Sequence, residues 1–291
     1  MGASNTTLNF LAGGGEMAER IRAFDWSRTD LGPIESWPQS LRSPLGMMLA
    51  SKAQIVLFFG PQFTVIYNDC YRPVFGAKHP HALGLPGQKA WAEIWNEPPH
   101  LQKLLEGVVR TGEAFWARDM LFPLERHGFV EDTFFDVSYD PVRDESGQVA
   151  GVYCIVTETT ARVVGEQRLA LLRDLAARNT TARTSKEACA LAMQAFAARP
   201  DDVLFALAYL DGKLQAATPG AEEKLAAATE REVRRVPIAR AGGAAPGELI
   251  VGLNPRRPFD DPYRAFAELL AGQLSTAVAN AEAYEHERRR A

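Results

Sequence analysis

The hydrophobic pattern of the first seventy residues changes from a helical period to a strand period. Apolar residues recur at helical spacing in residues 16–24, and again in residues 37–49 beyond a stretch broken by Gly32 and Pro33. Ser36, just ahead of a proline, is the expected N-cap of the second helix. Residues 55–69 are then rich in β-branched and aromatic side chains around one Gly-Pro turn. The pattern predicts two helices followed by a two-stranded hairpin.

Prolines and glycines recur at short intervals between residues 70 and 112, which allows only short helices before a longer one that follows Pro99. Residues 115–160 then predict three more strands, with the last hairpin at residues 138–148. Two strands, small helices, one longer helix and three strands make an antiparallel sheet with helices on one side. The predicted class of this half is α+β.

The second half begins with a predicted connector helix over residues 161–183. Leu169, Leu172 and Ala176 form one apolar stripe on it, with charged residues opposite. A second predicted domain, again α+β, follows over residues 184–291. Its expected elements are a helix capped by Thr184 or Ser185, a hairpin around Asp211 and Gly212, a short helix over residues 221–230, and strands at 231–240 and 247–254.

A long helix over residues 261–290 ends the predicted second domain. Its apolar positions follow a 4,3 repeat, which is typical of the seam of a two-helix contact. We interpret this seam as the surface through which two copies of the chain dimerise. The residues predicted to form the dimer helix are Leu270, Leu274, Ala277 and Ala281.

Composition narrows the classes of protein that fit. The 291 residues suit two domains, and 46% hydrophobic with 23% charged residues is ordinary for packed globular protein. The net charge of −4 argues against a generic nucleic-acid binder. No apolar run approaches the ~20 residues of a membrane span, and three scattered cysteines fit reduced thiols. We therefore predict a cytoplasmic protein with no membrane or nucleic-acid partner and a flexible N-terminus over residues 1–15.

Several longer motifs in the first half resemble a known family. DWSRTDLGP and SWPQSLR resemble the N-terminal segment of PAS regions in bacterial sensor histidine kinases, and YNDCYRPVFG resembles the first small helix of a PAS domain. SYDPVRDESGQVAGV matches the PAS hairpin between the last two strands. The resemblance covers residues 16–160. It implies that Glu158 and Thr160 form a signalling junction, in place of the Asp and Thr that usually end a PAS domain.

The second half resembles a GAF domain over residues 184–291. GLNPRRPFDDPYRAF and LLAGQLSTAVANAEAYEHER resemble the closing strand and exit helix that GAF domains share in sensor kinases. The segment in which GAF domains usually build a lid over their ligand is short here. The fold implied for the whole chain is two sensory domains, PAS-like and then GAF-like, joined and followed by long signalling helices.

The PAS resemblance also places a set of aromatic side chains around a concave interior. They define a candidate ligand pocket, and the alternative is that they simply fill the core. The candidate residues are Phe58, Tyr67, Trp91, Trp95, Phe135, Tyr139 and Tyr153.

Cofactor and metal signals are weak. His79 and His81 with Cys70 lack the ligand number and spacing of a metal site, so we predict no metal. Flavin-binding PAS domains use a cysteine that the matching stretch, residues 83–95, does not contain. Cys70 and Cys189 are not at the positions where a bilin is attached in phytochromes. His100 lies just ahead of the region that supplies the axial histidine in haem-binding PAS domains. We assign no cofactor and leave an unknown small ligand open.

Together these resemblances imply a non-catalytic sensory module of a bacterial two-component system. It would act as a homodimer and relay a ligand or partner signal through helices to a histidine kinase core or a response regulator, neither of which is encoded in these residues. Two alternatives stay open: a photosensor or redox sensor that binds bilin, flavin or haem, and a purely structural dimerisation scaffold.

Overall fold

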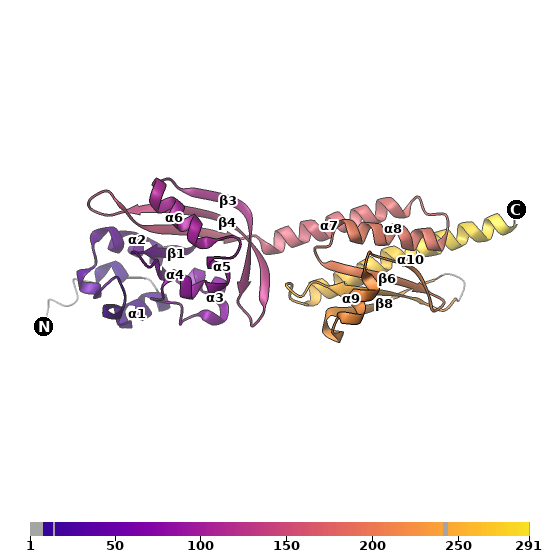
Figure 1. Ribbon diagram of the computed structural model, residues 1–291, viewed down its shortest axis with the longest axis horizontal. Helices are drawn as coiled ribbons and strands as arrows, with labels where there is room; N and C mark the ends of the chain where they lie inside the picture. Colours follow the sequence, from indigo (N-terminus) through magenta and orange to yellow (C-terminus); the bar gives the residue numbers. More distant parts are fainter. Residues whose placement is uncertain (1–7, 14, 241–243, 291) are drawn as a thin grey trace. The chain divides into compact units, whose positions relative to one another are not determined.

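The computed structural model describes residues 8–13, 15–240 and 244–290. The chain divides into two compact units, residues 1–160 and 161–291, and each is described by itself (Figure 1). One unit contains a five-stranded antiparallel sheet and the other a four-stranded antiparallel sheet, both with helices packed on them. The predicted α+β class is confirmed.

The first unit is built on a sheet with the strand order β2-β1-β5-β4-β3. Its strands are β1 (Gln54–Phe59), β2 (Thr64–Tyr67), β3 (Phe115–Glu125), β4 (Val130–Arg143) and β5 (Val149–Glu158). Residues 55–59 of β1 are buried on both faces, which explains why this strand is a continuous apolar run. Strand β4 instead alternates between buried and half-exposed residues, because only one of its faces is covered.

Short helices connect β2 to β3 and cover one face of this sheet. They are η4 (Asp69–Tyr71), α3 (Arg72–Phe75), η5 (Gly76–Lys78), α4 (Gly87–Ala90), α5 (Ala92–Trp95) and α6 (Leu101–Thr111). Gly87 is required where it lies, because a Cβ there would come within 2.7 Å of the Trp95 ring. This close approach brings α4 and α5 together over the sheet.

An N-terminal extension completes the first unit. It consists of η1 (Asn9–Leu11), α1 (Gly15–Ala23), η2 (Trp26–Arg28), η3 (Ile34–Ser36) and α2 (Gln39–Ala50). The indoles of Trp26 and Trp37 pack edge to face with their centroids 4.9 Å apart, and α2 packs against β1. Both helices predicted before the hairpin are therefore present.

Two expectations about this extension need correction. Residues 1–15 were expected to be flexible, but Leu11 is buried in the core of the unit; residues 1–7 and 14 lie outside the described residues. Ser36 does not cap α2. Its hydroxyl donates to the carbonyl oxygen of Pro33 within η3, and α2 begins only after Pro38.

The second unit is built on a sheet with the strand order β7-β6-β9-β8. Its strands are β6 (Val203–Leu210), β7 (Lys213–Ala217), β8 (Val233–Ile238) and β9 (Gly247–Leu253). Its helices are α7 (Thr160–Asn179), α8 (Ser185–Ala198), α9 (Ala221–Ala227), η6 (Glu230–Glu232) and α10 (Asp261–Arg290). The Thr184 hydroxyl accepts a hydrogen bond from the Glu187 amide, so Thr184 is the N-cap of α8, as predicted.

The 4,3 seam of α10 lies inside the second unit. Leu270, Leu274, Ala277 and Ala281 are all at most 3% exposed, and α10 packs along α8 of the same chain. The seam is a two-helix contact, as its spacing indicated, but its partner is α8. These four side chains are consumed by the core and do not present a surface to a second copy.

The inward stripe of α7 also differs from the expected one. Leu171 and Leu175 are buried, whereas Leu169 is 46% exposed and Ala176 is exposed. The two stripes are offset by about a third of the helix circumference, and Leu172 of the expected stripe packs at the edge of the core. Among the helices that the structure describes, none is long and apolar enough to cross a membrane.

Candidate functional site

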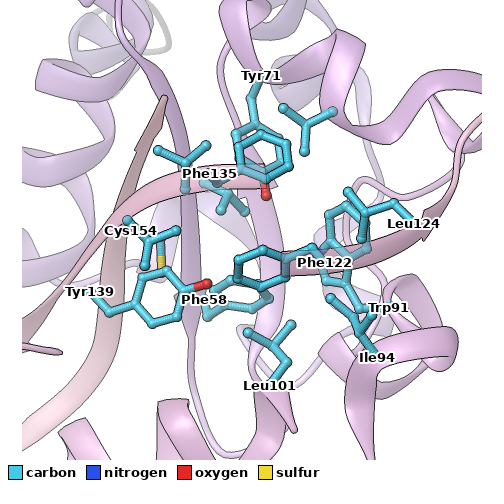
Figure 2. A pocket seen from close by; sticks show the side chains of 14 residues that line it. Phe58, Tyr71, Trp91, Ile94, Leu101, Phe122, Leu124, Phe135, Tyr139 and Cys154 are labelled. Carbon is cyan, nitrogen blue, oxygen red and sulfur yellow. The ribbon is translucent and has the colours of Figure 1, made fainter. Parts of the chain in front are cut away.

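The interior of the first unit encloses a small cavity between its sheet and its short helices. Figure 2 shows the side chains that surround it. The space left between them measures about 20 Å³, which is room for about one water molecule. Its lining residues are Val56, Phe58, Tyr71, Val74, Trp91, Ile94, Leu101, Phe122, Leu124, Phe135, Val137, Tyr139, Cys154 and Val156.

Four of the seven aromatic residues predicted for this pocket line the cavity: Phe58, Trp91, Phe135 and Tyr139. They come from β1, from the junction of α4 and α5, and from alternate positions of β4. The structure thus brings together side chains that are up to eighty residues apart in sequence.

Tyr67, Trp95 and Tyr153 do not line the cavity. Tyr153 lies between Val152 and Cys154, which face inward, so the alternation of β5 turns its ring to the opposite face of the sheet. Tyr67 directs its hydroxyl to the Nδ1 atom of His79, 2.8 Å away. The Trp95 ring packs across Gly87.

The cavity has polar atoms as well as rings. Figure 2 shows the hydroxyl groups of Tyr71 and Tyr139 directed toward its middle. The Nε1 atom of Trp91 is buried and has no hydrogen-bond partner among the described residues. A buried polar group without a partner costs about 1–3 kcal/mol. The cavity therefore offers hydrogen bonds that the protein itself does not use.

The titratable groups that line the cavity are uncharged at neutral pH. Burial raises the pKa of both Tyr71 and Tyr139 well above the ordinary tyrosine value. Burial likewise raises the pKa of the Cys154 thiol well above its ordinary value, so it stays protonated and unreactive at neutral pH. The cavity can hydrogen-bond a small neutral molecule, and it contains no activated nucleophile among the residues that line it.

A charged network ties the end of β5 to the hairpin between β3 and β4. The guanidinium of Arg126, 7% exposed, donates to both carboxylate oxygens of Glu158 at 2.9 and 3.1 Å. It also pairs with Glu131 on β4, with a shortest distance of 3.0 Å. Desolvation opposes the charge of Arg126, but the two carboxylates outweigh it and hold its pKa above the ordinary value.

The same network fixes the start of α7. The Thr160 hydroxyl donates to Glu158 at 2.9 Å and accepts a hydrogen bond from the Phe134 amide at 2.9 Å. The Thr159 amide donates to the Phe134 carbonyl oxygen at 2.8 Å, and its hydroxyl donates to Asp119. The first residue of α7 is therefore held to β4 as well as to the strand that precedes it.

Glu158 and Thr160 were predicted as the signalling junction, and they are hydrogen-bonded to each other. Arg126, Glu131 and Asp119 were not predicted. Arg126 lies in a hairpin more than thirty residues before Glu158. Its neighbouring residues in the sequence do not distinguish it from an arginine that is exposed to solvent in a turn. The one available signal was Glu158 itself, because a carboxylate that becomes partly buried needs a cation.

The cavity and the junction share one strand. Phe135 lines the cavity, packs edge to face with Phe122 at 5.8 Å between centroids, and pairs in register with Glu158. Phe134, the next residue, supplies the backbone groups that hold Thr159 and Thr160. A change in the position of β4 at the cavity must therefore move the partners of the first turn of α7.

The remaining candidate ligands lie elsewhere. His79 binds Tyr67 and approaches Glu16 at 3.4 Å, His81 is exposed, and the Cys70 thiol lies 3.9 Å from the Ser51 carbonyl oxygen. His100 precedes α6, and its ring bonds the Asn96 carbonyl oxygen. Within the described part of the chain no three His, Cys, Asp or Glu side chains gather as a metal site would require.

Part of the chain matches a known protein family. Residues 49–164 match the family described as PAS fold, which covers the sheet, the cavity and the junction. This part of the chain, from the end of α2 into the first turn of α7, is therefore similar to the PAS fold. A search of curated proteins found no match to the chain.

Solved structures with similarity to the chain include three sensory proteins. An RNA-binding light-oxygen-voltage receptor has 19% identity over 39% of this chain and 31% of its own, with a TM-score of 0.32, so the match spans about a third of the receptor. A sensory box sensor histidine kinase from Vibrio cholerae has 13% identity, covering 40% of this chain and 89% of its own, with a TM-score of 0.28. The phytochrome photosensory core module of Stigmatella aurantiaca has 14% identity, covering 82% of this chain and 60% of its own, with a TM-score of 0.31.

Proposed function

We propose that this chain is a non-catalytic sensory module in which the PAS domain passes the state of its interior to α7 through the junction at Glu158 and Thr160. The observation that carries the proposal is the double role of β4. Phe135 lines the cavity, while its register partner Glu158 holds the first residue of α7. Both ends of the relay lie on the same pair of strands.

The relay needs two states that a signal can distinguish. Occupation of the cavity by more than one water would displace side chains, because the present space is about 20 Å³. Phe135 and Phe122 are diagonal neighbours on the paired strands β4 and β3, so their displacement would strain β3 and β4 together. Arg126 bridges those strands to Glu158 and would transmit the strain to α7.

We propose further that the second unit is a GAF-like domain and that the module works in a two-component system. Support comes from the arrangement of its helices and its antiparallel sheet, and from the sequence motifs around residues 252–288. In this proposal the module is a homodimer in the cytoplasm, and the output of α10 goes to a histidine kinase core or a response regulator.

A double-mutant cycle on the full chain tests the relay. Phe135→Leu changes the cavity wall, and Arg126→Met removes the bridge to Glu158. Hydrogen exchange at residues 161–165 measures how easily the first turns of α7 open. We expect Phe135→Leu to change that opening by a larger amount in the wild-type chain than in the Arg126→Met variant, with a coupling of about 0.5–2 kcal/mol.

Two matched controls accompany the cycle. Arg118→Met removes an exposed arginine from β3, the strand that precedes Arg126, and Leu45→Val perturbs the core of the unit away from the cavity. Neither is expected to couple to Phe135→Leu. Additive effects of Phe135→Leu and Arg126→Met, within about 0.3–0.5 kcal/mol, would show that no relay runs through this bridge.

An absorption spectrum separates the apo sensor from a cofactor sensor. We expect freshly purified protein to show the ultraviolet bands of its aromatic residues alone. A visible band that is lost on denaturation would replace this proposal with the photosensor or redox-sensor alternative.

A further inference from the structure

The Trp91 ring connects the cavity of the first unit with the protein surface. Trp91 is 2% exposed and lines the cavity, and the Lys78 ammonium lies over its ring, 4.3 Å from the centroid. Lys78 is ion-paired with Glu93, and the two side chains are 24% and 17% exposed, so the pair reaches the solvent. The same ring thus borders the cavity on one side and a partly solvent-exposed ion pair on another.

The wall that contains Trp91 is less firmly built than the sheet. The sheet side of the cavity is formed by β1, β3, β4 and β5, which are hydrogen-bonded to their neighbours. Trp91 instead joins α4 and α5, two helices of four residues each, and Ile94 of α5 lines the same side (Figure 2). Helices this short are not stable by themselves, so α4 and α5 depend on contacts with neighbouring elements. A change in cavity size should displace them before it displaces a strand.

Glu93 holds α5 to two of these neighbours. Its carboxylate accepts a hydrogen bond from the Lys78 ammonium of η5, and the same Oε1 atom accepts one from the Glu125 amide of β3 at 3.3 Å. The Lys78 ammonium also donates to the carbonyl oxygen of Ala90 in α4, at 3.4 Å. The pair of Lys78 and Glu93 therefore ties both short helices to η5 and to the edge strand of the sheet.

Two groups in this wall would gain contact with water if it opened. Burial lowers the pKa of Lys78, because desolvation outweighs the attraction of Glu93, so the charged ammonium is better solvated outside. The Nε1 atom of Trp91 is buried and has no hydrogen-bond partner among the described residues. Water would satisfy both groups, which offsets part of the cost of opening. The stacking of Trp91 on Phe75, with 4.5 Å between centroids, favours the closed wall.

We propose that Trp91 is a gate to the cavity and that the ion pair between Lys78 and Glu93 is the latch that keeps it closed. Separation of the pair frees α5 from η5 and the Trp91 ring from the Lys78 ammonium. The ring can then swing away and admit a small neutral molecule, and closure seals that molecule from solvent. This inference rests on the proposed function for the role of the cavity, and it adds the route by which the cavity is filled.

The thiol of Cys154 can report on the gate, because it lines the cavity. Cys154 is 1% exposed and its raised pKa keeps it protonated, so a thiol reagent should modify it only when the wall opens. The probe is methyl methanethiosulfonate, a small uncharged reagent, added to the full chain. Peptide mass spectrometry measures the rate of modification at each cysteine. Cys189, buried in the core of the second unit, is the internal control.

Loss of the latch should speed the modification of Cys154. Lys78→Met keeps an apolar stem over the Trp91 ring, and Glu93→Gln keeps an acceptor oxygen, so each substitution removes little more than the charge. We expect each to raise the rate at Cys154 about three- to tenfold, which lies between the effects of exposed and of buried ion pairs. The double variant should be no faster than the faster single variant, because both substitutions remove the same pair.

Lys103→Met is the matched control, since it makes the same substitution at an exposed lysine of α6. It should leave the rate at Cys154 unchanged, and no variant should change the rate at Cys189. Low concentrations of urea separate opening of the gate from unfolding of the first unit. Opening exposes little surface, so urea should change the rate at Cys154 only slightly, whereas unfolding would make the rate rise steeply.

Four results would overturn the proposal. A rate at Cys154 that neither latch variant changes would place the entrance elsewhere. Single effects that multiply in the double variant would show that Lys78 and Glu93 do not act as one pair. Equal acceleration by Lys103→Met or at Cys189 would indicate general loosening, and a urea dependence as steep as that of unfolding would mean that the cavity has no gate. None of these variants alters Phe135 or Arg126, so the gate and the relay can fail independently.

Discussion

In the first unit the helices pack on the sheet largely through aromatic side chains, whereas in the second unit they pack largely through alanines. In the first unit Phe75 stacks on Trp91 with 4.5 Å between ring centroids, and Phe122 packs edge to face with Phe135 on the neighbouring strand. In the second unit α8 and α10 present small side chains to each other and to the sheet. Those that are at most 3% exposed include Ala188, Ala192, Ala195, Ala271 and Ala277.

The difference has a physical basis. Rings are large and rigid, and those of Tyr and Trp bring polar atoms inside. Small side chains let helices approach one another closely, so the second unit is held by helix packing along α8 and α10. The first unit is thus built around an interior of rings, and the second around closely packed helices.

The largest expected effect concerns the seam of α10. Leu274→Ala should lower the free energy of unfolding of the second unit by about 2–5 kcal/mol, because its fully buried side chain would leave a cavity. Leu214→Ala, at an exposed leucine, should change it by less than about 0.5 kcal/mol. Urea unfolding followed by helical circular dichroism measures both.

The first unit serves as an internal reference in that experiment. All five tryptophans lie between residues 26 and 116, so tryptophan fluorescence reports on the first unit alone. A Leu274→Ala variant that kept its stability and lost its dimer would return the seam to the dimerising role that its 4,3 repeat first suggested.

A smaller effect is a pH dependence of stability that we expect in the first unit. Burial lowers the pKa of His79 below its usual 6.5, although a hydrogen bond with Glu16 opposes the shift. The unfolded chain then binds the proton more readily than the folded unit. Stability from this group is complete above about pH 6.5 and is lost as the pH falls through the folded pKa. The urea concentration at the midpoint of unfolding, measured by tryptophan fluorescence, should therefore decrease as the pH is lowered below 6.5.

His79→Gln provides the comparison for that measurement. Loss of the titrating group should make the urea midpoint measured by fluorescence less dependent on pH in this range. The pH dependence of the second unit, measured by circular dichroism, should not change. An NMR pKa for His79 above 6.5 would contradict the expectation directly.

The smallest expected effect tests the unused hydrogen bonds of the cavity. Tyr139→Phe should leave the free energy of unfolding within about 0.5 kcal/mol or raise it, because the hydroxyl has no partner to lose among the described residues. Tyr67→Phe is the matched control and should cost about 1 kcal/mol, since that hydroxyl bonds His79. A loss above about 1 kcal/mol for Tyr139→Phe would mean that a bound molecule occupies the cavity and bonds this hydroxyl.

Local pattern was enough to predict much of the first unit. The periods and turns predicted its strands, and the PAS resemblance singled out Glu158 and Thr160, whose side chains are hydrogen-bonded to each other. Pattern did not predict Arg126, because its partner lies on another strand. It also assigned Tyr153 to the cavity, since aromatic character says nothing about which face of a strand a ring occupies.

The sequence by itself determined the α+β class, the order of the elements and one apolar stripe on each long helix, because these depend on period and composition along one segment. Only the tertiary structure decided which stripe each helix buries. α7 buries Leu171 and Leu175 and leaves Leu169 outside, and α10 buries Leu274 and leaves Leu269 outside. Both stripes satisfy the helical period, and the choice between them depends on the shape of the partner, which no local pattern contains.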